Sequence, residues 1–212
     1  MQYLRRHPLI LTLAAALTGL CLAISTTHAS TDYDFAGVFP QDNATHSEFI
    51  TLTAVSSVTL FSSSFATGGF DPYISLWSPT GQLIDQNDDS ITGGFASANG
   101  VSYFVSDLDF YLFIPNLAPG TYQASISQAG NIPVNTQLSS GLTQANHPHY
   151  TVDPSSPFPQ APNFNLPFGQ GNTTGSWAFH ANVEPVPLPP AIWNGLALLG
   201  LLGGIQLLRR HA

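Results

Sequence analysis

A short acidic run near the middle of the chain offers the densest set of oxygen ligands. The run reads Asp-Gln-Asn-Asp-Asp over residues 85–89, and Asp71 follows a Gly-Gly-Phe turn upstream. A hard cation such as Ca²⁺ takes six to eight oxygens at short range, and alternate acidic positions open many calcium loops. The sequence therefore predicts a calcium site built from Asp71, Asp85, Asn87, Asp88 and Asp89. The alternative is a solvated loop whose Asp and Asn side chains cap their own backbone.

Two further sets of residues are candidates for catalysis or metal binding. Asp107 and Asp109 are expected on one face of a strand, where they would form an acid–base pair, hold an ion or lie at an exposed edge. The His147-Pro148-His149 segment needs His46 or His180 to complete a zinc or copper site. His180 itself is expected to face solvent. No nucleophile elbow, phosphate loop or H-E-x-x-H motif occurs, and no serine stands in an activating pattern.

Charge is distributed unevenly along the chain. There is no lysine, and the arginines are Arg5, Arg6, Arg209 and Arg210. All twelve acidic residues lie between Asp32 and Glu184, so that region carries twelve negative charges and no positive ones. Nucleic acid is excluded as a partner, because phosphate binding depends on Lys and Arg. Carboxylates without internal cations either stay solvated or recruit metal ions.

The elements that must position these residues are strands. Apolar residues alternate with polar ones around residues 50–54, 122–126 and 177–183, and short aromatic or β-branched runs occupy 58–61, 73–77, 103–105 and 110–114. Turn signals such as Asn99-Gly100 separate them. About eight short strands predict an all-β fold, an antiparallel jelly-roll-like β-sandwich over residues 30–184. The run 110–114 lacks alternation and is expected to be a central strand covered on both faces.

One segment of this domain departs from the strand pattern. Residues 131–176 are rich in Pro, Asn, Gly and Ser, and proline cannot supply a continuous hydrogen-bonded ladder. We expect a long irregular excursion before the last strand. Phe158, Phe164 and Phe168 are expected to pin it to the sandwich.

Both ends of the chain carry targeting signals. Residues 1–29 combine Arg5-Arg6, an apolar run and a small-residue end at Ala29, which is typical of a secretory signal peptide. Residues 185–212 form a tail in which a proline-rich spacer precedes an uncharged stretch, 191–208. As a helix that stretch measures roughly 27 Å, about one hydrocarbon core. Arg209 and Arg210 close it and are expected on the cytoplasmic side.

The order of these parts resembles the PEP-CTERM sorting tail of Gram-negative bacteria. The residues that carry the resemblance are Val186, Pro187, Leu188, Pro189, Pro190 and Ala191, which look like the VPLPA variant of the recognition motif. The Pro-Glu-Pro form is absent, and Val183-Glu184-Pro185 stands nearby instead. The resemblance implies an exosortase-type enzyme in the inner membrane as a partner, with the helix as a transient anchor.

The domain also resembles a family of secreted bacterial β-domains similar to the pre-peptidase C-terminal domain. The resemblance rests on GGFDPYISLW at 68–77, GQLI at 81–84, NDD at 87–89, LAPGTY at 117–122 and Asn131. It implies a surface or matrix role linked to exopolysaccharide, without established catalysis, and some relatives bind calcium.

Together these observations predict a non-catalytic exported protein of the cell surface or extracellular matrix. One alternative is a secreted hydrolase that uses Asp107 and Asp109 or a histidine metal site. Another is a carbohydrate-binding module, which would need Tyr73, Trp77 or Tyr111 exposed as a platform for sugar rings.

Overall fold

A computed structural model describes residues 30–90, 93–166 and 171–187 of the chain. Residues 29–186 form one compact unit. The described residues form ten strands and two short 3₁₀ helices, η1 (Phe65–Thr67) and η2 (Leu138–Ser140), and contain no α-helix. None of their helices is long and apolar enough to cross a bilayer. The signal peptide, the apolar stretch 191–208, the terminal arginines and most of the sorting motif lie outside the described residues.

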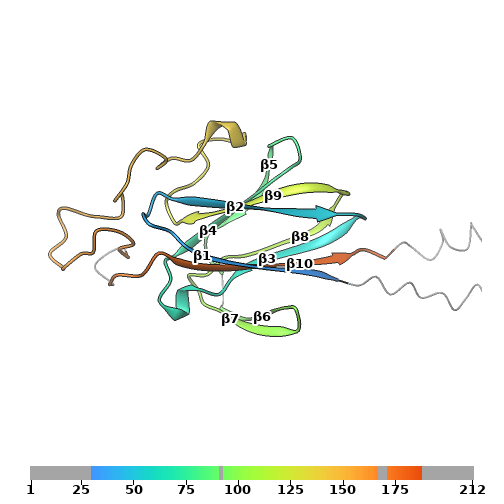
Figure 1. Cartoon of the computed structure of the whole chain (residues 1–212), viewed down its shortest axis with the longest axis horizontal. Helices are drawn as coiled ribbons and strands as arrows, with labels where there is room; N and C mark the ends of the chain where they lie inside the picture. Colours follow the sequence, from blue (N-terminus) through green and yellow to red (C-terminus); the bar gives the residue numbers. More distant parts are fainter. Residues whose placement is uncertain (1–29, 91–92, 167–170, 188–212) are drawn as a thin grey trace, which may run out of the picture. The chain divides into compact units, whose positions relative to one another are not determined.

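The strands form two four-stranded antiparallel sheets and a hairpin. Sheet A has the order β1 (Thr31–Val38), β10 (Ser176–Pro185), β3 (Ser56–Ser62), β8 (Tyr111–Leu117). Sheet B has the order β2 (Thr45–Leu52), β9 (Gly120–Gln128), β4 (Pro72–Trp77), β5 (Leu83–Asn87). The hairpin pairs β6 (Gly94–Ala98) with β7 (Val101–Val105) and lies outside sheet A (Figure 1). The predicted all-β antiparallel fold is confirmed.

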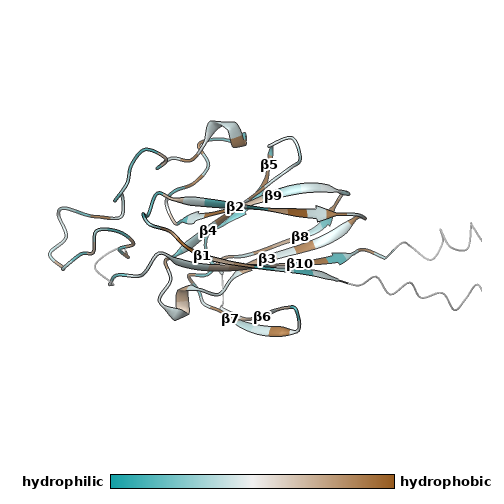
Figure 2. Cartoon of the chain, in the orientation of Figure 1, coloured by the Kyte–Doolittle hydropathy of each residue, from teal (hydrophilic) through white to brown (hydrophobic). Residues whose placement is uncertain are grey.

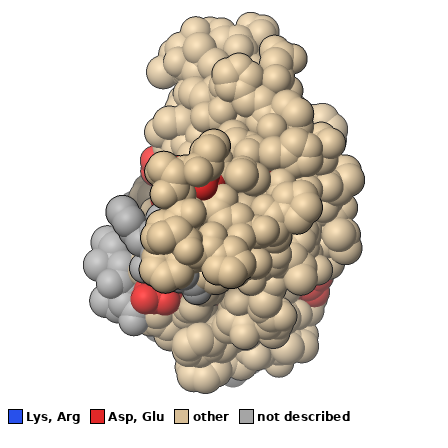
Figure 3. All heavy atoms as spheres, turned by 90° about the vertical axis from the view of Figure 1, so that its left-hand side faces the viewer, with Lys and Arg blue, Asp and Glu red and all other residues tan. Residues whose placement is uncertain are grey.

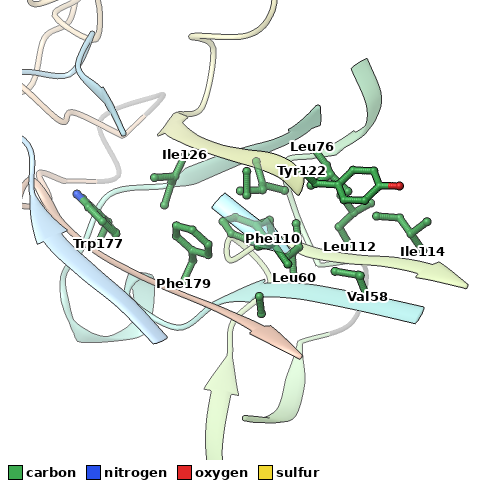
Figure 4. Packing of buried hydrophobic residues seen from close by; sticks show 14 of the residues in the cluster. Val58, Leu60, Leu76, Phe110, Leu112, Ile114, Tyr122, Ile126, Trp177 and Phe179 are labelled. Carbon is green, nitrogen blue, oxygen red and sulfur yellow. The ribbon is translucent and has the colours of Figure 1, made fainter. Parts of the chain in front are cut away.

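One apolar core fills the space between the sheets. On β10 the inward residues are Trp177, Phe179, Ala181 and Val183, and all four are buried. Trp177 and Phe179 project between the layers, with Ile126 of sheet B opposite (Figure 4). Apolar residues recur along the strands of both layers, as alternation requires (Figure 2). Burying one such side chain contributes about 1.5–3 kcal/mol, so the shared core holds the sandwich together.

The β6–β7 hairpin shows how turn residues set the register. Asn99 and Gly100 both have positive φ, 51° and 72°, which a two-residue type I′ turn requires. The turn pairs Ala98 with Val101 and brings the buried residues Ala98 and Val105 onto Phe61 of sheet A. This small second core fixes the hairpin over the outer face of sheet A.

The prediction of a central strand at 110–114 is wrong. β8 lies at the edge of sheet A, and Tyr111 and Phe113 are exposed while Leu112 and Ile114 are buried. The aromatic residues hid the ordinary alternation of a strand with one solvated face. Strands β1, β5 and β6 are additional to the expected ones. Each contains Asp, Asn, Gly or Ala, which are depleted in strands, so their strand propensity is low.

The irregular excursion is present between β9 and β10. It contains η2 and isolated bridges, among them Pro133 to Leu142. The buried carboxylate of Asp42 anchors it by accepting hydrogen bonds from the Thr151 hydroxyl at 2.6 Å and the His149 amide at 2.7 Å. Phe164 is buried in the core as expected, whereas Phe158 is exposed, and Phe168 lies outside the described residues.

Candidate functional site

The pairing of β4 with β5 brings three carboxylates together. Asp71 directly precedes β4, and Asp88 and Asp89 directly follow β5. Because the strands are antiparallel, with Ile74 opposite Asn87, the start of β4 lies beside the end of β5. Carboxylate oxygens of Asp71, Asp88 and Asp89 all lie within 4.8 Å of one another. We call these three residues the acidic cluster.

The acidic cluster is electrostatically strained when no cation is bound. Burial, followed by the charges of Asp88 and Asp89, raises the pKa of Asp71 to about 8. Burial and then the charge of Asp89 raise the pKa of Asp88 to about 6, and burial also raises the pKa of Asp89. One oxygen of Asp71 and one of Asp88 are buried without a hydrogen-bond partner. Within the described residues there is no Lys or Arg to offset this charge, whereas a proton or a bound cation would.

The donor set fits a hard divalent cation. Three carboxylates supply up to six anionic oxygens, the ligand type that Ca²⁺ prefers, and two of these oxygens have no competing partner. Protein thiolates, which softer metals favour, are missing here because the single cysteine of the chain is Cys21.

The other two residues of the predicted calcium site, Asp85 and Asn87, lie on β5 and make hydrogen bonds of their own. Asp85 is exposed on β5, and its Oδ1 accepts a hydrogen bond from the Gln86 amide at 2.9 Å. Oδ1 of Asn87 accepts a hydrogen bond from the Tyr111 amide at 3.1 Å, which ties β5 to the edge of sheet A. Alternate residues of an extended strand are about 6.6 Å apart, whereas the ligands of a calcium loop converge because the loop curves around the ion. An extended β5 therefore does not have the shape of a calcium loop.

The Asp107–Asp109 pair is not on a strand, contrary to the prediction. Both residues lie in the turn between β7 and β8, where Asp107 is exposed and Asp109 is fully buried. Asp109 accepts hydrogen bonds from the Ser62 hydroxyl at 2.7 Å and from the amide and hydroxyl of Ser106 at 3.0 and 2.9 Å. The Asp109 carboxylate thus accepts hydrogen bonds from its own turn and from the end of β3, which is a structural role.

The histidines are not gathered into a metal site within the described part of the chain, where the acidic cluster is the one group with metal-ligand spacing. His46 pairs with Glu48 at 2.7 Å, and Nδ1 of His149 contacts the carbonyl of Pro162 at 2.7 Å. His180 is buried, not solvent-facing as expected, because the β6–β7 hairpin covers that face of β10.

His180 belongs to a polar set that the sequence did not reveal. Its Nδ1 lies 2.6 Å from Oδ1 of Asp34, and its Nε2 lies 2.8 Å from Oγ of Ser63. The three residues come from β1, β10 and the end of β3, which are neighbours in sheet A. The alternation 177–183 places His180 on the outer face, but no local motif links it to Asp34 or Ser63. We call Asp34, His180 and Ser63 the outer-face triad.

The comparisons with known proteins contribute no assignment. A scan against known protein families finds no match, and no curated protein is similar to the chain.

Two hollows adjoin the acidic cluster. One of about 310 Å³ is lined by Asp89, Phe95 and Tyr111 among others. The second, of about 680 Å³, lies between Asp71, the end of β9 and the excursion, and Phe158 is among its lining residues. The face shown in Figure 3 presents scattered acidic atoms among uncharged residues. These surfaces suit neutral, hydroxyl-rich ligands better than anionic ones.

Proposed function

We propose that the chain is an exported protein of the cell surface or extracellular matrix whose β-sandwich is stabilised by calcium at Asp71, Asp88 and Asp89. The observation that carries the proposal is the acidic cluster, in which two buried carboxylate oxygens have no partner in a region without a single Lys or Arg. Extracellular calcium modules work with dissociation constants of about 10⁻⁴–10⁻³ M, so a modest site suffices outside the cell.

We extend the proposal to the route of export. An exosortase-type enzyme would recognise the segment from Val186 to Ala191, while the stretch 191–208 anchors the chain in the inner membrane until processing. The sequence resemblance supports this, and the sheet ends at Pro185, directly before the motif.

The finer fold assignment is a jelly roll. Numbered along the chain, sheet A takes strands 1, 10, 3 and 8, and sheet B takes 2, 9, 4 and 5. If the β6–β7 hairpin is an insertion, the remaining eight strands alternate between the two sheets except at β4 and β5, which are consecutive in sheet B, as in paired Greek keys. This order supports the resemblance to the pre-peptidase C-terminal domain.

The proposed matrix role includes contact with exopolysaccharide. Phe95 is 77% exposed and Tyr111 is 44% exposed, and both line the hollow beside Asp89. Aromatic faces can stack on sugar rings, and a neighbouring carboxylate can accept hydrogen bonds from sugar hydroxyls. This favours the carbohydrate-binding alternative with Tyr111 in the platform, whereas Tyr73 and Trp77 are buried and cannot contribute. The role needs no catalytic step.

Thermal unfolding of the full-length protein in calcium and in chelator tests the ion. At a tenfold excess over the dissociation constant, calcium should stabilise the fold by about 1.4 kcal/mol. For a domain of this size the melting temperature should rise by about 3–6 °C. Equal melting temperatures in about 10 mM calcium and in chelator would overturn the calcium part of the proposal.

A further inference from the structure

The outer-face triad occupies three adjacent strands of sheet A. Asp34 of β1 stands directly opposite His180 of β10 in the antiparallel register. On the other side His180 stands opposite Phe61 of β3, and Ser63 is two residues beyond Phe61. Since alternate residues share a face, all three side chains lie on the outer side of the sheet. The register of the sheet therefore places a hydroxyl, an imidazole and a carboxylate in one row.

The hydrogen bonds within the row have a defined direction. A carboxylate only accepts, so the 2.6 Å contact with Asp34 requires the proton of His180 on Nδ1. Nε2 then carries a lone pair, and the Ser63 hydroxyl donates to it over 2.8 Å. Nucleophile, base and orienting carboxylate stand in the same relation as in hydrolases that use Ser, His and Asp.

The surroundings hold His180 in this orientation. The Tyr103 ring lies over the imidazole with centroids 3.8 Å apart, and Phe61 stacks nearby at 4.8 Å. Asp34 also accepts a hydrogen bond from the side-chain amide of Asn99, in the hairpin turn. Burial alone would raise the pKa of Asp34, but hydrogen bonds from His180 and Asn99 outweigh it and lower the pKa, which keeps the carboxylate ionised.

Ser63 opens onto a hollow that can receive a substrate. Ser63 is half-buried and lines a space of about 450 Å³, whose other lining residues include Ser64, Thr67, Tyr103, Phe104 and Trp177. None of the residues that line this hollow is charged. Its volume and its mixture of aromatic rings and hydroxyls fit a small, neutral acyl ester.

We propose that Ser63 is a nucleophile for acyl transfer, with His180 as its general base and Asp34 as the positioning residue. Ser63 Oγ attacks the ester carbonyl carbon and passes its proton to His180 Nε2. The bond to the alcohol oxygen breaks, and the same proton goes to the leaving alcohol. Water then attacks the acyl carbon and gives a proton to Nε2, the Oγ–carbon bond breaks, and Ser63 regains its proton. The net reaction converts ester and water to acid and alcohol, and it is independent of the calcium proposal.

A fluorophosphonate probe, which phosphonylates activated serines, tests this on the full-length chain. We expect one label per chain, found on the peptide that contains Ser63 by mass spectrometry. Ser63→Ala should remove the label. Ser57→Ala is the matched control, because Ser57 lies on β3, which Ser63 directly follows, but bonds the carbonyl of Glu184 instead of an imidazole. Ser57→Ala should label at the rate of the unmodified protein.

The role of Asp34 needs a separate readout. Asp34→Asn should slow labelling about 10²-fold, the lower end of what general-base catalysis contributes, and Asp34→Glu should restore part of the rate. Failure of the unmodified protein to label, or a label on a serine other than Ser63, would overturn the proposal. Because the site of labelling is mapped in the unmodified protein, the outcome is decisive even if Ser63→Ala fails to fold.

Discussion

At the residue scale, the acidic cluster makes the stability of the metal-free protein depend on pH. Asp71 and Asp88 have pKa values near 8 and 6, above the ordinary value of 3.8 for Asp. Between about pH 4 and pH 8 the folded state therefore binds more protons than the unfolded state, so the free energy of unfolding falls as pH rises. In chelator, the contribution of Asp71 and Asp88 to the melting temperature should be greatest below pH 4. It should decline as pH rises to about 8.

The variant Asp71→Asn separates this effect from other titrations. It removes the charge that burial penalises, so it should raise the melting temperature in chelator at pH 8 and abolish the response to calcium. Asp85→Asn, at an exposed position outside the acidic cluster, should change neither. A melting temperature in chelator that is flat from pH 4 to 8 would show that the three carboxylates are not strained.

Asp109 should contribute to the stability of the fold and not to catalysis. Asp109→Ala leaves the hydroxyl of Ser62 and the amide of Ser106 without their partner in a fully buried site. We expect a loss of about 3 kcal/mol in the free energy of unfolding, measured by urea denaturation. Asp107→Ala, in the same turn but exposed, should change it by less than about 0.5 kcal/mol. Equal effects of the two substitutions would contradict this assignment.

Sequence spacing anticipated part of the acidic cluster and none of the outer-face triad. Asp88 and Asp89 were predicted as ligands from the acidic run 85–89, and Asp71 was added from a neighbouring turn. Asp85 and Asn87 were included on the pattern of a loop, but β5 runs through both of them. The outer-face triad joins residues 34, 63 and 180, and only the register of three strands brings these together. Short-range patterns carry no information on such a register.

At the scale of elements, the entry into β10 depends on Gly175. A Cβ atom there would lie 2.1 Å from the carbonyl oxygen of Phe39 and 3.0 Å from the Phe164 ring. The backbone cannot yield easily, because the amide of Phe39 donates to the carbonyl of Gly175 at 2.8 Å. Gly175→Ala should therefore cost on the order of 2 kcal/mol by urea denaturation.

Gly120→Ala is the control for this substitution. Its Cβ would meet the nearest atom at 3.1 Å, a ring carbon of Pro79 that can shift slightly. We expect a cost below about 1 kcal/mol. If both variants lost the same stability, the close approach at Gly175 would not be what fixes the position of β10.

The strands themselves were largely predictable where alternation was clear. The segments around 50–52, 122–126 and 177–183 coincide with β2, β9 and β10 because each has one face on the core. β1 was missed although Asp32 and Asp34 alternate with Tyr33 and Phe35, which is the period of a strand with one buried face. The order of strands could not be derived from sequence. Most neighbours in the sheets, such as β1 and β10, are far apart in the chain, and no local pattern specifies which distant strands pair.

At the scale of the whole molecule, the proposal concerns where the chain resides. Deleting residues 186–212, or removing the exosortase-type enzyme, should move the protein between the membrane, surface and medium fractions. Immunoblots of the fractions report this directly. An unchanged distribution after both changes would refute sorting by the tail, while the calcium and acyl-transfer proposals would remain open to their own tests.

The central claim is that the acidic cluster binds calcium, and isothermal titration tests it most directly. With the full-length chain in chelator-treated buffer at pH 7.5, titrated to about 10 mM to cover weak extracellular sites, we predict one Ca²⁺ per chain. The double variant Asp71→Asn, Asp88→Asn should bind none. Absence of binding in the unmodified protein, or unaltered binding in the double variant, would contradict the account.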